Sequence, residues 1–207
     1  LKTDRPEEFQ TFWTNFGAVL KEGLIADVES RDQLLAVSTF ASTRVESSDV
    51  AGGSESAEAG EASATGTTIA EYISRMPEGQ EEIYYLTGTS RAAVENSPHL
   101  EAFRARGVEV LVLTDPVDEV WVDAVGEVDG KRLRSVAKGD VDLSGIGVDP
   151  TDSAEEANKP DAAEFEDLLT WLGEELEDEV KQVRLSHRLT ESAACMVGDE
   201  FDMTPQL

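Results

Sequence analysis

The fold of this chain is decided by the stretch Val110-Leu111-Val112-Leu113-Thr114-Asp115-Pro116. Its four consecutive apolar residues are typical of a β-strand that is covered on both faces of a sheet. Asp115 followed by Pro116 then predicts a helix start, because aspartate caps helices well and proline suits the first helical position. The next apolar residues keep the spacing of one helix face: Val117, Val120, Trp121 and Ala124. The stretch therefore predicts a buried strand that leads into an amphipathic helix.

A second strand is predicted upstream, at Ile83-Tyr84-Tyr85-Leu86, and residues 90–107 between the two strands have helical signals. A strand, a helix and a strand in this order favour a right-handed crossover and a parallel pair. A short strand near 132–136 would extend the sheet. Residues 68–140 therefore predict a small three-layer αβα subdomain with a short parallel sheet, which is an α/β fold. Its first helix would begin with a capping box at Thr68-Ile69-Ala70-Glu71.

Residues 1–44 are predicted to form a helical connector ahead of this subdomain. A long apolar stripe runs through its first helix: Phe9, Phe12, Trp13, Phe16, Val19 and Leu20. The stripe could be a binding face, but aromatic residues at this density favour a core position. Ser30-Arg31-Asp32-Gln33 predicts a capping box at the start of a second helix.

Two segments lack the apolar residues that a core needs. Residues 45–67 are rich in Ala, Gly, Glu and Ser and predict a flexible loop, and residues 141–160 predict a linker. Residues 161–207 then predict a third region, an incomplete α+β segment with a helix near Phe165–Leu172 and strands at 180–189 and 193–197. We expect this region to be poorly supported by a core of its own.

Composition narrows the classes of function. The chain has 207 residues with 17 Lys and Arg against 44 Asp and Glu, a formal net charge of −27. Such a charge repels phosphate backbones and anionic lipids, so we expect no nucleic-acid or membrane partner. The single cysteine, Cys195, cannot form an internal disulfide and fits a reducing compartment. The chain begins at Leu1 without an initiator methionine, and both ends are expected to be cuts in a longer protein.

No catalytic, cofactor-binding or metal-binding motif is apparent in the sequence. Neither a Walker-type phosphate loop nor a GxGxxG pattern occurs. Asp115 follows a predicted parallel strand, where ligand sites of α/β proteins occur, but Asp followed by Pro is also an ordinary helix start. We therefore favour the capping role for Asp115.

Several stretches resemble one chaperone family. In chain order they are Phe12-Trp13-Thr14-Asn15-Phe16-Gly17, Phe40-Ala41-Ser42-Thr43, Tyr72-Ile73-Ser74-Arg75-Met76, Ile83-Tyr84-Tyr85-Leu86-Thr87-Gly88, Glu95-Asn96-Ser97-Pro98-His99-Leu100-Glu101, Val110 to Glu119, Ser135-Val136-Ala137-Lys138 and Val183-Arg184-Leu185-Ser186-His187-Arg188-Leu189-Thr190. This ordered set is similar to the ninety-kilodalton heat-shock chaperones of the bacterial HtpG type. Residues 1–140 would belong to the later part of the middle domain, and residues 161–207 to the start of the C-terminal domain.

The resemblance implies a cytoplasmic, dimeric, ATP-driven chaperone that binds unfolded or partly folded client proteins. ATP with Mg would bind in an N-terminal domain that these residues do not include. The helices that form the dimer would lie beyond Leu207. We therefore expect this piece to be a monomer that hydrolyses no ATP. A seventy-kilodalton heat-shock chaperone is a further partner that the resemblance suggests.

The resemblance also assigns client binding to the helix after Thr114-Asp115-Pro116, at Glu119, Val120, Trp121 and Asp123. The bacterial pattern has a tryptophan directly after the acid, whereas here Val120 holds that place and Trp121 follows. One residue turns a side chain by about 100° around a helix. Trp121 also falls on the apolar stripe predicted to face the core, so either it is buried or its ring reaches the edge of the stripe. We expect it to be partly exposed and usable as an anchor for apolar chains.

Two other readings of the sequence stay open at this point. One is a small α/β enzyme or receiver-like domain that holds a metal ion with Asp115 and its acidic neighbours. The other is a spacer whose acidity keeps domains apart, which predicts no client binding.

Overall fold

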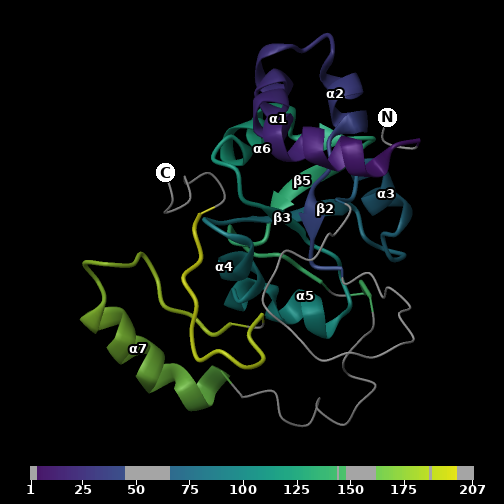
Figure 1. Cartoon of the computed structure of the whole chain (residues 1–207). Helices are drawn as coiled ribbons and strands as arrows, with labels where there is room; N and C mark the ends of the chain where they lie inside the picture. Colours follow the sequence, from purple (N-terminus) through teal and green to yellow (C-terminus); the bar gives the residue numbers. More distant parts are fainter. Residues whose placement is uncertain (1–3, 45–65, 144, 148–161, 187, 200–207) are drawn as a thin grey trace, which may run out of the picture.

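The computed structural model describes residues 4–44, 66–143, 145–147, 162–186 and 188–199 (Figure 1). The helices in these residues are α1 (Pro6–Ala26), α2 (Arg31–Val37), α3 (Ile69–Ser74), α4 (Arg91–Glu95), η1 (Pro98–Leu100), α5 (Glu101–Ala105), α6 (Asp118–Val125), η4 (Ala162–Phe165) and α7 (Glu166–Glu175). The strands are β1 (Ala41–Ser42), β2 (Glu82–Thr87), β3 (Leu111–Leu113), β4 (Glu127–Val128) and β5 (Lys131–Ser135). No helix in the described ranges combines the length and the apolar character that a membrane crossing requires.

A five-stranded sheet in the order β1-β3-β2-β5-β4 forms the middle of the molecule. β2 pairs in parallel with β3 and with β5, which confirms the predicted α/β fold and its parallel pair. The two edge strands run antiparallel to their neighbours and were not predicted. β4 and β5 form a hairpin through Asp129 and Gly130, whose φ angles are both positive. An Asp-Gly pair favours such a turn, so the sequence did carry this signal.

The molecule has three layers, because helices cover both faces of the sheet and an apolar cluster fills the space on each face. α1, α2, α3 and α6 cover one face, while α4, η1 and α5 cover the other (Figure 1). Side chains of a strand alternate between faces. Ile83 and Tyr85 accordingly lie in the first cluster, and Tyr84 and Leu86 in the second. β2 is therefore buried on both sides, as its near-continuous apolar sequence predicts.

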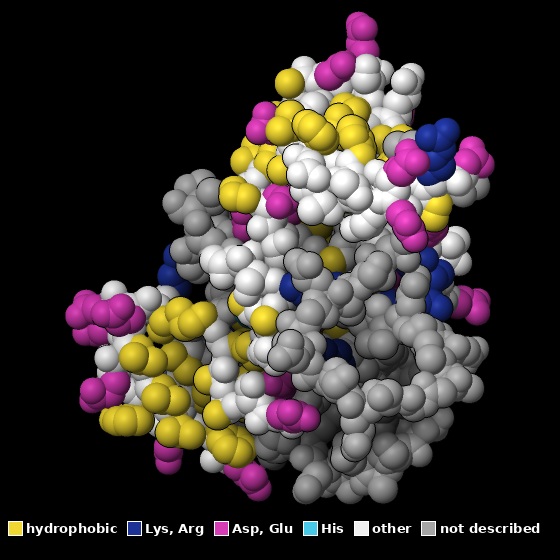
Figure 2. Space-filling view, in the orientation of Figure 1, with side chains coloured by type: hydrophobic (Ala, Val, Ile, Leu, Met, Phe, Trp, Pro, Cys, Tyr) yellow, Lys and Arg dark blue, Asp and Glu magenta, His cyan; other side chains and the backbone are white. Residues whose placement is uncertain are grey.

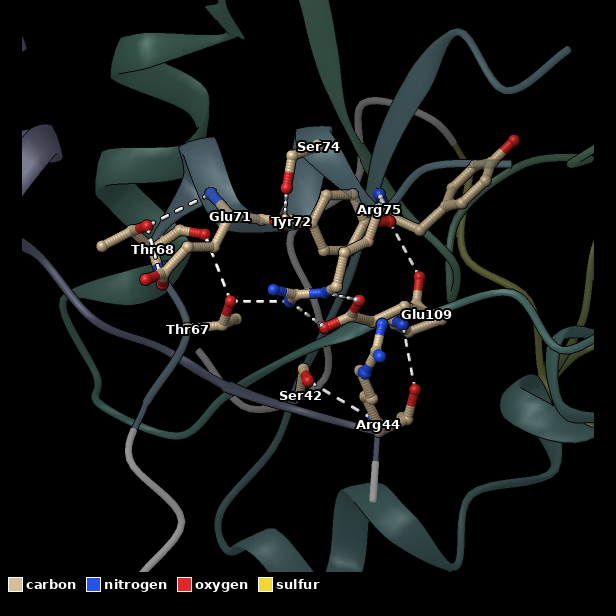
Figure 3. Close-up of polar contacts among 12 residues, drawn as sticks. Ser42, Arg44, Thr67, Thr68, Glu71, Tyr72, Ser74, Arg75 and Glu109 are labelled. Carbon is tan, nitrogen blue, oxygen red and sulfur yellow. Dashed lines mark hydrogen bonds and ion pairs between the residues drawn. The ribbon is translucent and has the colours of Figure 1, made fainter. Parts of the chain in front are cut away.

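Polar contacts fix α3 on the sheet (Figure 3). The predicted capping box is present: Glu71 N donates to Thr68 Oγ1 at 3.2 Å, and Thr68 N donates to the Glu71 carboxylate at 2.7 Å. Arg75 reaches both carboxylate oxygens of Glu109, at 3.1 and 2.8 Å. The Tyr72 hydroxyl donates to the Glu109 carbonyl at 2.7 Å. These contacts hold α3 against the segment that enters β3.

Some local expectations were wrong or fall outside the described residues. Ser30 precedes α2 but its side chain makes no capping bond, so the predicted capping box there does not form. Residues 45–65, most of the predicted flexible loop, lie outside the described residues. At the end of that segment, Thr67 exchanges two backbone hydrogen bonds of 2.8 Å with Phe40. In the predicted linker, Leu143 and Ile146 are buried in the second cluster, and residues 148–160 are not described.

The C-terminal region differs from the prediction. Where it is described, 180–189 and 193–197 contain no strand, and the single ladder contact is a bridge between Lys138 and Gly198. No residue whose burial is described between 164 and 199 is buried. The alternation of apolar residues here has no neighbouring strand to pair with, which explains the wrong prediction. The exposure of these residues agrees with the expectation that 161–207 are poorly supported by a core of their own.

Candidate functional site

Helix α6 places the four predicted client-binding residues on different sides. Trp121 is fully buried, with 0% of its surface exposed, so the expectation of partial exposure was wrong. Val120 is 48% exposed, Asp123 is exposed and Glu119 is half-buried. The large apolar side chain that α6 exposes to solvent is therefore Val120, at the position where the bacterial pattern has its tryptophan.

A buried carboxylate holds Trp121 inward. The indole nitrogen of Trp121 donates to Asp118 Oδ1 at 2.6 Å, and Asp118 is completely buried. The ring of Trp121 packs against Phe40, with 5.3 Å between the ring centroids. A buried indole N–H needs an acceptor, and Asp118 supplies one from the preceding turn of the same helix. The spacing of Asp118 and Trp121 thus turns the tryptophan away from solvent.

Lys21 of α1 neutralises this carboxylate from across the helix interface. Its Nζ lies 2.8 Å from Asp118 Oδ1 and 2.8 Å from Asp115 Oδ2. The backbone N–H of Asp115 also donates to Asp118 Oδ2, at 3.0 Å. A buried charge is tolerated when it is paired and hydrogen-bonded. The cluster of Lys21, Asp115, Asp118 and Trp121, called here the α6 anchor, joins α1 to α6.

The α6 anchor corrects the role predicted for Asp115. α6 begins at Asp118, and its N-cap residue, Val117, makes no side-chain capping bond. Asp115 pairs with Lys21 instead of capping the helix. A metal ion at Asp115 and Asp118 would have to displace the Lys21 ammonium. No group of three or more potential metal-ligating side chains occurs in the described part of the chain. The arrangement therefore favours a structural role over the metal-binding hypothesis.

The outer side of α6 is apolar at Val120 and acidic along one edge, where Glu119 and Asp123 lie one turn apart. Asp123 follows Val120 by three residues, so the two side chains lie one turn apart on the helix. Burial raises the pKa of Tyr85 in β2, and the negative charges of Asp123 and Glu119 raise it further. Such a surface can hold an apolar segment that carries basic neighbours.

A second exposed apolar surface lies on α1, where the sequence predicted core. Phe12, Phe16 and Val19 are exposed, while Phe9 is buried with Gly17, Lys21 and Leu24 on the inner side. Figure 2 shows apolar side chains gathered on the part of the molecule that α1 forms. The buried side of α1 is centred on Gly17, Lys21 and Leu24, so the predicted stripe lies beside that side and only Phe9 of it is buried.

Comparisons with known proteins match the chain along its whole length. Residues 2–207 match the model of the family described as Hsp90 protein. The chain is 53% identical over 207 residues to the Chaperone protein HtpG of Streptomyces coelicolor, covering 100% of this chain and 29% of that protein. Its similarity to the HtpG of Mycobacterium tuberculosis strain H37Rv is 52% identity over 207 residues, again 100% and 29%. With the HtpG of Salinispora arenicola it shares 54% identity over 209 residues, 100% of this chain and 30% of the relative. The chain spans less than a third of the length of these relatives.

Proposed function

The chain belongs to the Hsp90 protein family, and from that premise we propose that it is a client-handling part of an ATP-dependent molecular chaperone. The observation that supports this most strongly is identity above 50% over the whole chain to proteins named Chaperone protein HtpG. The proposal covers binding of unfolded or partly folded proteins in the cytoplasm. ATP hydrolysis with Mg and homodimer formation are assigned to the rest of the longer protein.

The proposal divides the chain into functional parts. Residues 1–44 are the helical connector and residues 68–140 the small αβα subdomain of the middle domain. Residues 161–207 are the start of the C-terminal domain. A seventy-kilodalton heat-shock chaperone is proposed as a partner of the whole protein.

We place client contact on the outer side of α6, at Glu119, Val120 and Asp123. Val120 supplies an exposed apolar contact, and the two acids attract the basic residues of a client. Trp121 acts behind this surface: its burial against Phe40 and Asp118 fixes the direction in which Val120 points. A site with one valine at its centre buries little area, so we expect each contact to be weak and reversible.

Fluorescence anisotropy of a labelled, permanently unfolded polypeptide titrated with the chain tests this function. The informative variant is Val120→Ser, because Val120 is exposed and its loss leaves the core intact. Val37→Ser is the matched control, since Val37 is 45% exposed on α2. We expect saturable binding that weakens several-fold in Val120→Ser and is unchanged in Val37→Ser.

Two outcomes would contradict the proposal. Binding that is equal in all three proteins would remove the client site from α6. A complete lack of binding by the folded chain would favour the spacer hypothesis.

A further inference from the structure

Three exposed apolar residues form a stripe on the outer side of α1. Phe12 is 40% exposed, Phe16 54% and Val19 62%, and they follow one another at helical spacing. The rings of Phe12 and Phe16 are in contact, with 5.4 Å between their centroids. We call these three residues the α1 stripe.

The described contacts that hold α1 on the molecule come from the other side of the helix. Lys21 follows Val19 by two residues, which is about 200° around a helix, and it faces Asp118 of α6. Leu24 is completely buried in the first cluster. α1 is therefore held by its opposite side. Large apolar side chains that gather on a surface without a packing role mark sites of interaction.

Acidic residues bound the stripe at both ends. Glu8 precedes Phe12 by four residues and Glu22 follows Val19 by three, so each lies one helical turn from an end of the stripe. Both are exposed. Glu8 pairs with Arg5 at 3.2 Å, but both side chains are more than half exposed, and such pairs contribute little. The two carboxylates are 14 residues apart in sequence, which corresponds to about 21 Å along the helix.

We infer that the α1 stripe is a docking surface for a basic amphipathic helix of a partner protein. Charge complementarity selects this occupant: apolar side chains along two turns would cover Phe12, Phe16 and Val19, and Lys or Arg beyond each end would reach Glu8 and Glu22. Helix-against-helix recognition of this kind uses anchors at i, i+4 and i+7. The strongly negative chain, at −27, would also attract such a segment from a distance.

The inference goes beyond the client site on α6 and does not depend on it. The two surfaces use different residues, and α1 contacts α6 through its other side. The contact area of three side chains is small, so we expect transient binding.

The test uses a fluorescent helical peptide of about 18 residues, with leucines at i, i+4 and i+7 and a lysine pair one turn beyond each end. A second peptide replaces every lysine with glutamate. Anisotropy is measured with the unmodified chain, with the stripe variant Phe16→Ser and with the control Val37→Ser. A double variant combines Glu8→Gln with Glu22→Gln. Val19→Ser is a second stripe variant, and circular dichroism checks that each variant is folded.

We expect the basic peptide to bind saturably and the acidic peptide to bind at least about tenfold more weakly, because like charges repel. Both stripe variants should weaken binding about tenfold, and the Val37→Ser variant should bind like the unmodified chain. The glutamine pair should reduce both the affinity and its dependence on salt.

Three results would overturn the inference. The first is equal binding of both peptides, which indicates apolar adhesion without charge selection. The second is binding unaffected in Phe16→Ser and Val19→Ser. The third is a concentration-dependent dimer that the same variants abolish, since a second copy would then occupy the stripe. Loss of peptide binding in Phe16→Ser with client binding retained would separate this surface from the α6 site.

Discussion

Helices α6 and α7 share an amphipathic pattern and an acidic first turn, but they lie in opposite environments. Each is a short amphipathic helix with one tryptophan, yet Trp121 of α6 is 0% exposed and Trp171 of α7 is 54% exposed. α6 packs against α1 and against the apolar cluster on the sheet, whereas α7 has no buried residue and mainly contacts η4. In Figure 1, α7 lies at the edge of the molecule, away from the sheet. An apolar helix face therefore becomes core only where other elements supply a surface opposite to it.

The C-terminal region is held by polar contacts instead of a core. The Glu101 carboxylate accepts hydrogen bonds from the backbone amides of Thr190 at 2.6 Å, Glu191 at 2.8 Å and Ser192 at 3.1 Å. Arg188 donates to the carbonyls of Val136 and Gly139, at 2.9 and 2.6 Å. Such contacts fix a position but bury little apolar area. The C-terminal region should open more easily than the sheet unit.

The largest expected difference between the two helices is the cost of removing each tryptophan. Trp121→Ala removes a buried ring and the donor to Asp118, so we expect the free energy of unfolding to fall by about 3–5 kcal/mol. Trp171→Ala should change it by less than about 1 kcal/mol, because the ring is exposed. Urea unfolding followed by circular dichroism measures both. Similar losses in the two variants would mean that α7 packs as tightly as α6.

The α6 anchor should give the next largest effect. Lys21→Met removes the cation between Asp115 and Asp118 and leaves a buried carboxylate without its counter-charge. We expect a loss of about 3 kcal/mol in urea unfolding. Arg5→Met breaks the exposed pair with Glu8 and serves as the control, with an expected change below about 0.5 kcal/mol. A negligible effect of Lys21→Met would show that the buried pair does not join α1 to α6.

The contact at Glu101 should respond to pH. Hydrogen bonds from the Glu191 amide, the Ser192 hydroxyl and the Thr190 amide hold the pKa of Glu101 at about 2, below its ordinary value of 4.5. The folded state thus favours the ionised carboxylate, so the contact is fully present above about pH 4.5 and is lost as the pH falls towards 2. Hydrogen-exchange protection of the amides at 190–192 should decrease over that range.

Glu101→Gln tests the same contact at neutral pH. We expect protection of the amides at 190–192 to fall about tenfold, because a neutral amide is a weaker acceptor than a carboxylate. Amides of β3 should keep their protection. Unchanged protection at 190–192 would mean that Glu101 does not hold the C-terminal region.

The smallest expected effect on stability is that of Val120→Ser. Val120 is half exposed, so its replacement should change the free energy of unfolding by less than about 0.5 kcal/mol. Thermal and urea unfolding measure this directly. A loss above 1.5 kcal/mol would place Val120 in the core with Trp121.

Local signals in the sequence predicted local structure well. Apolar runs at 83–86 and 110–113 predicted the parallel strands β2 and β3, because strands buried on both faces have little alternation. The Thr68 capping box formed as predicted, since both of its bonds join residues three apart. The exposure of Trp121 was not predictable in this way. Trp121 is held by Asp118 three residues before it, but the buried Asp118 is in turn paired with Lys21, which lies 97 residues earlier in the chain.

Three of the wrong predictions share one physical cause, whereas the missing capping box at Ser30 is a local failure. The exposure of Phe12 and Phe16, the absence of strands in the described parts of 180–189 and the pairing of Asp115 with Lys21 all depend on which elements meet in space. Periodicity shows that a face is apolar, but it does not show what covers that face. For α6 the sequence therefore predicted the helix itself but not which of its apolar residues faces solvent, and the client-binding role of the helix stays a prediction.

Site-specific crosslinking tests the central claim most directly, that clients contact the outer side of α6. Photoreactive groups are attached to Val120→Cys or to Trp171→Cys, each combined with Cys195→Ala so that a single thiol reacts. The labelled proteins are then mixed with an unfolded polypeptide and illuminated. We predict efficient crosslinking from position 120 and little from position 171, although both are exposed. Crosslinking from position 171 alone would contradict the account and move the client site to α7.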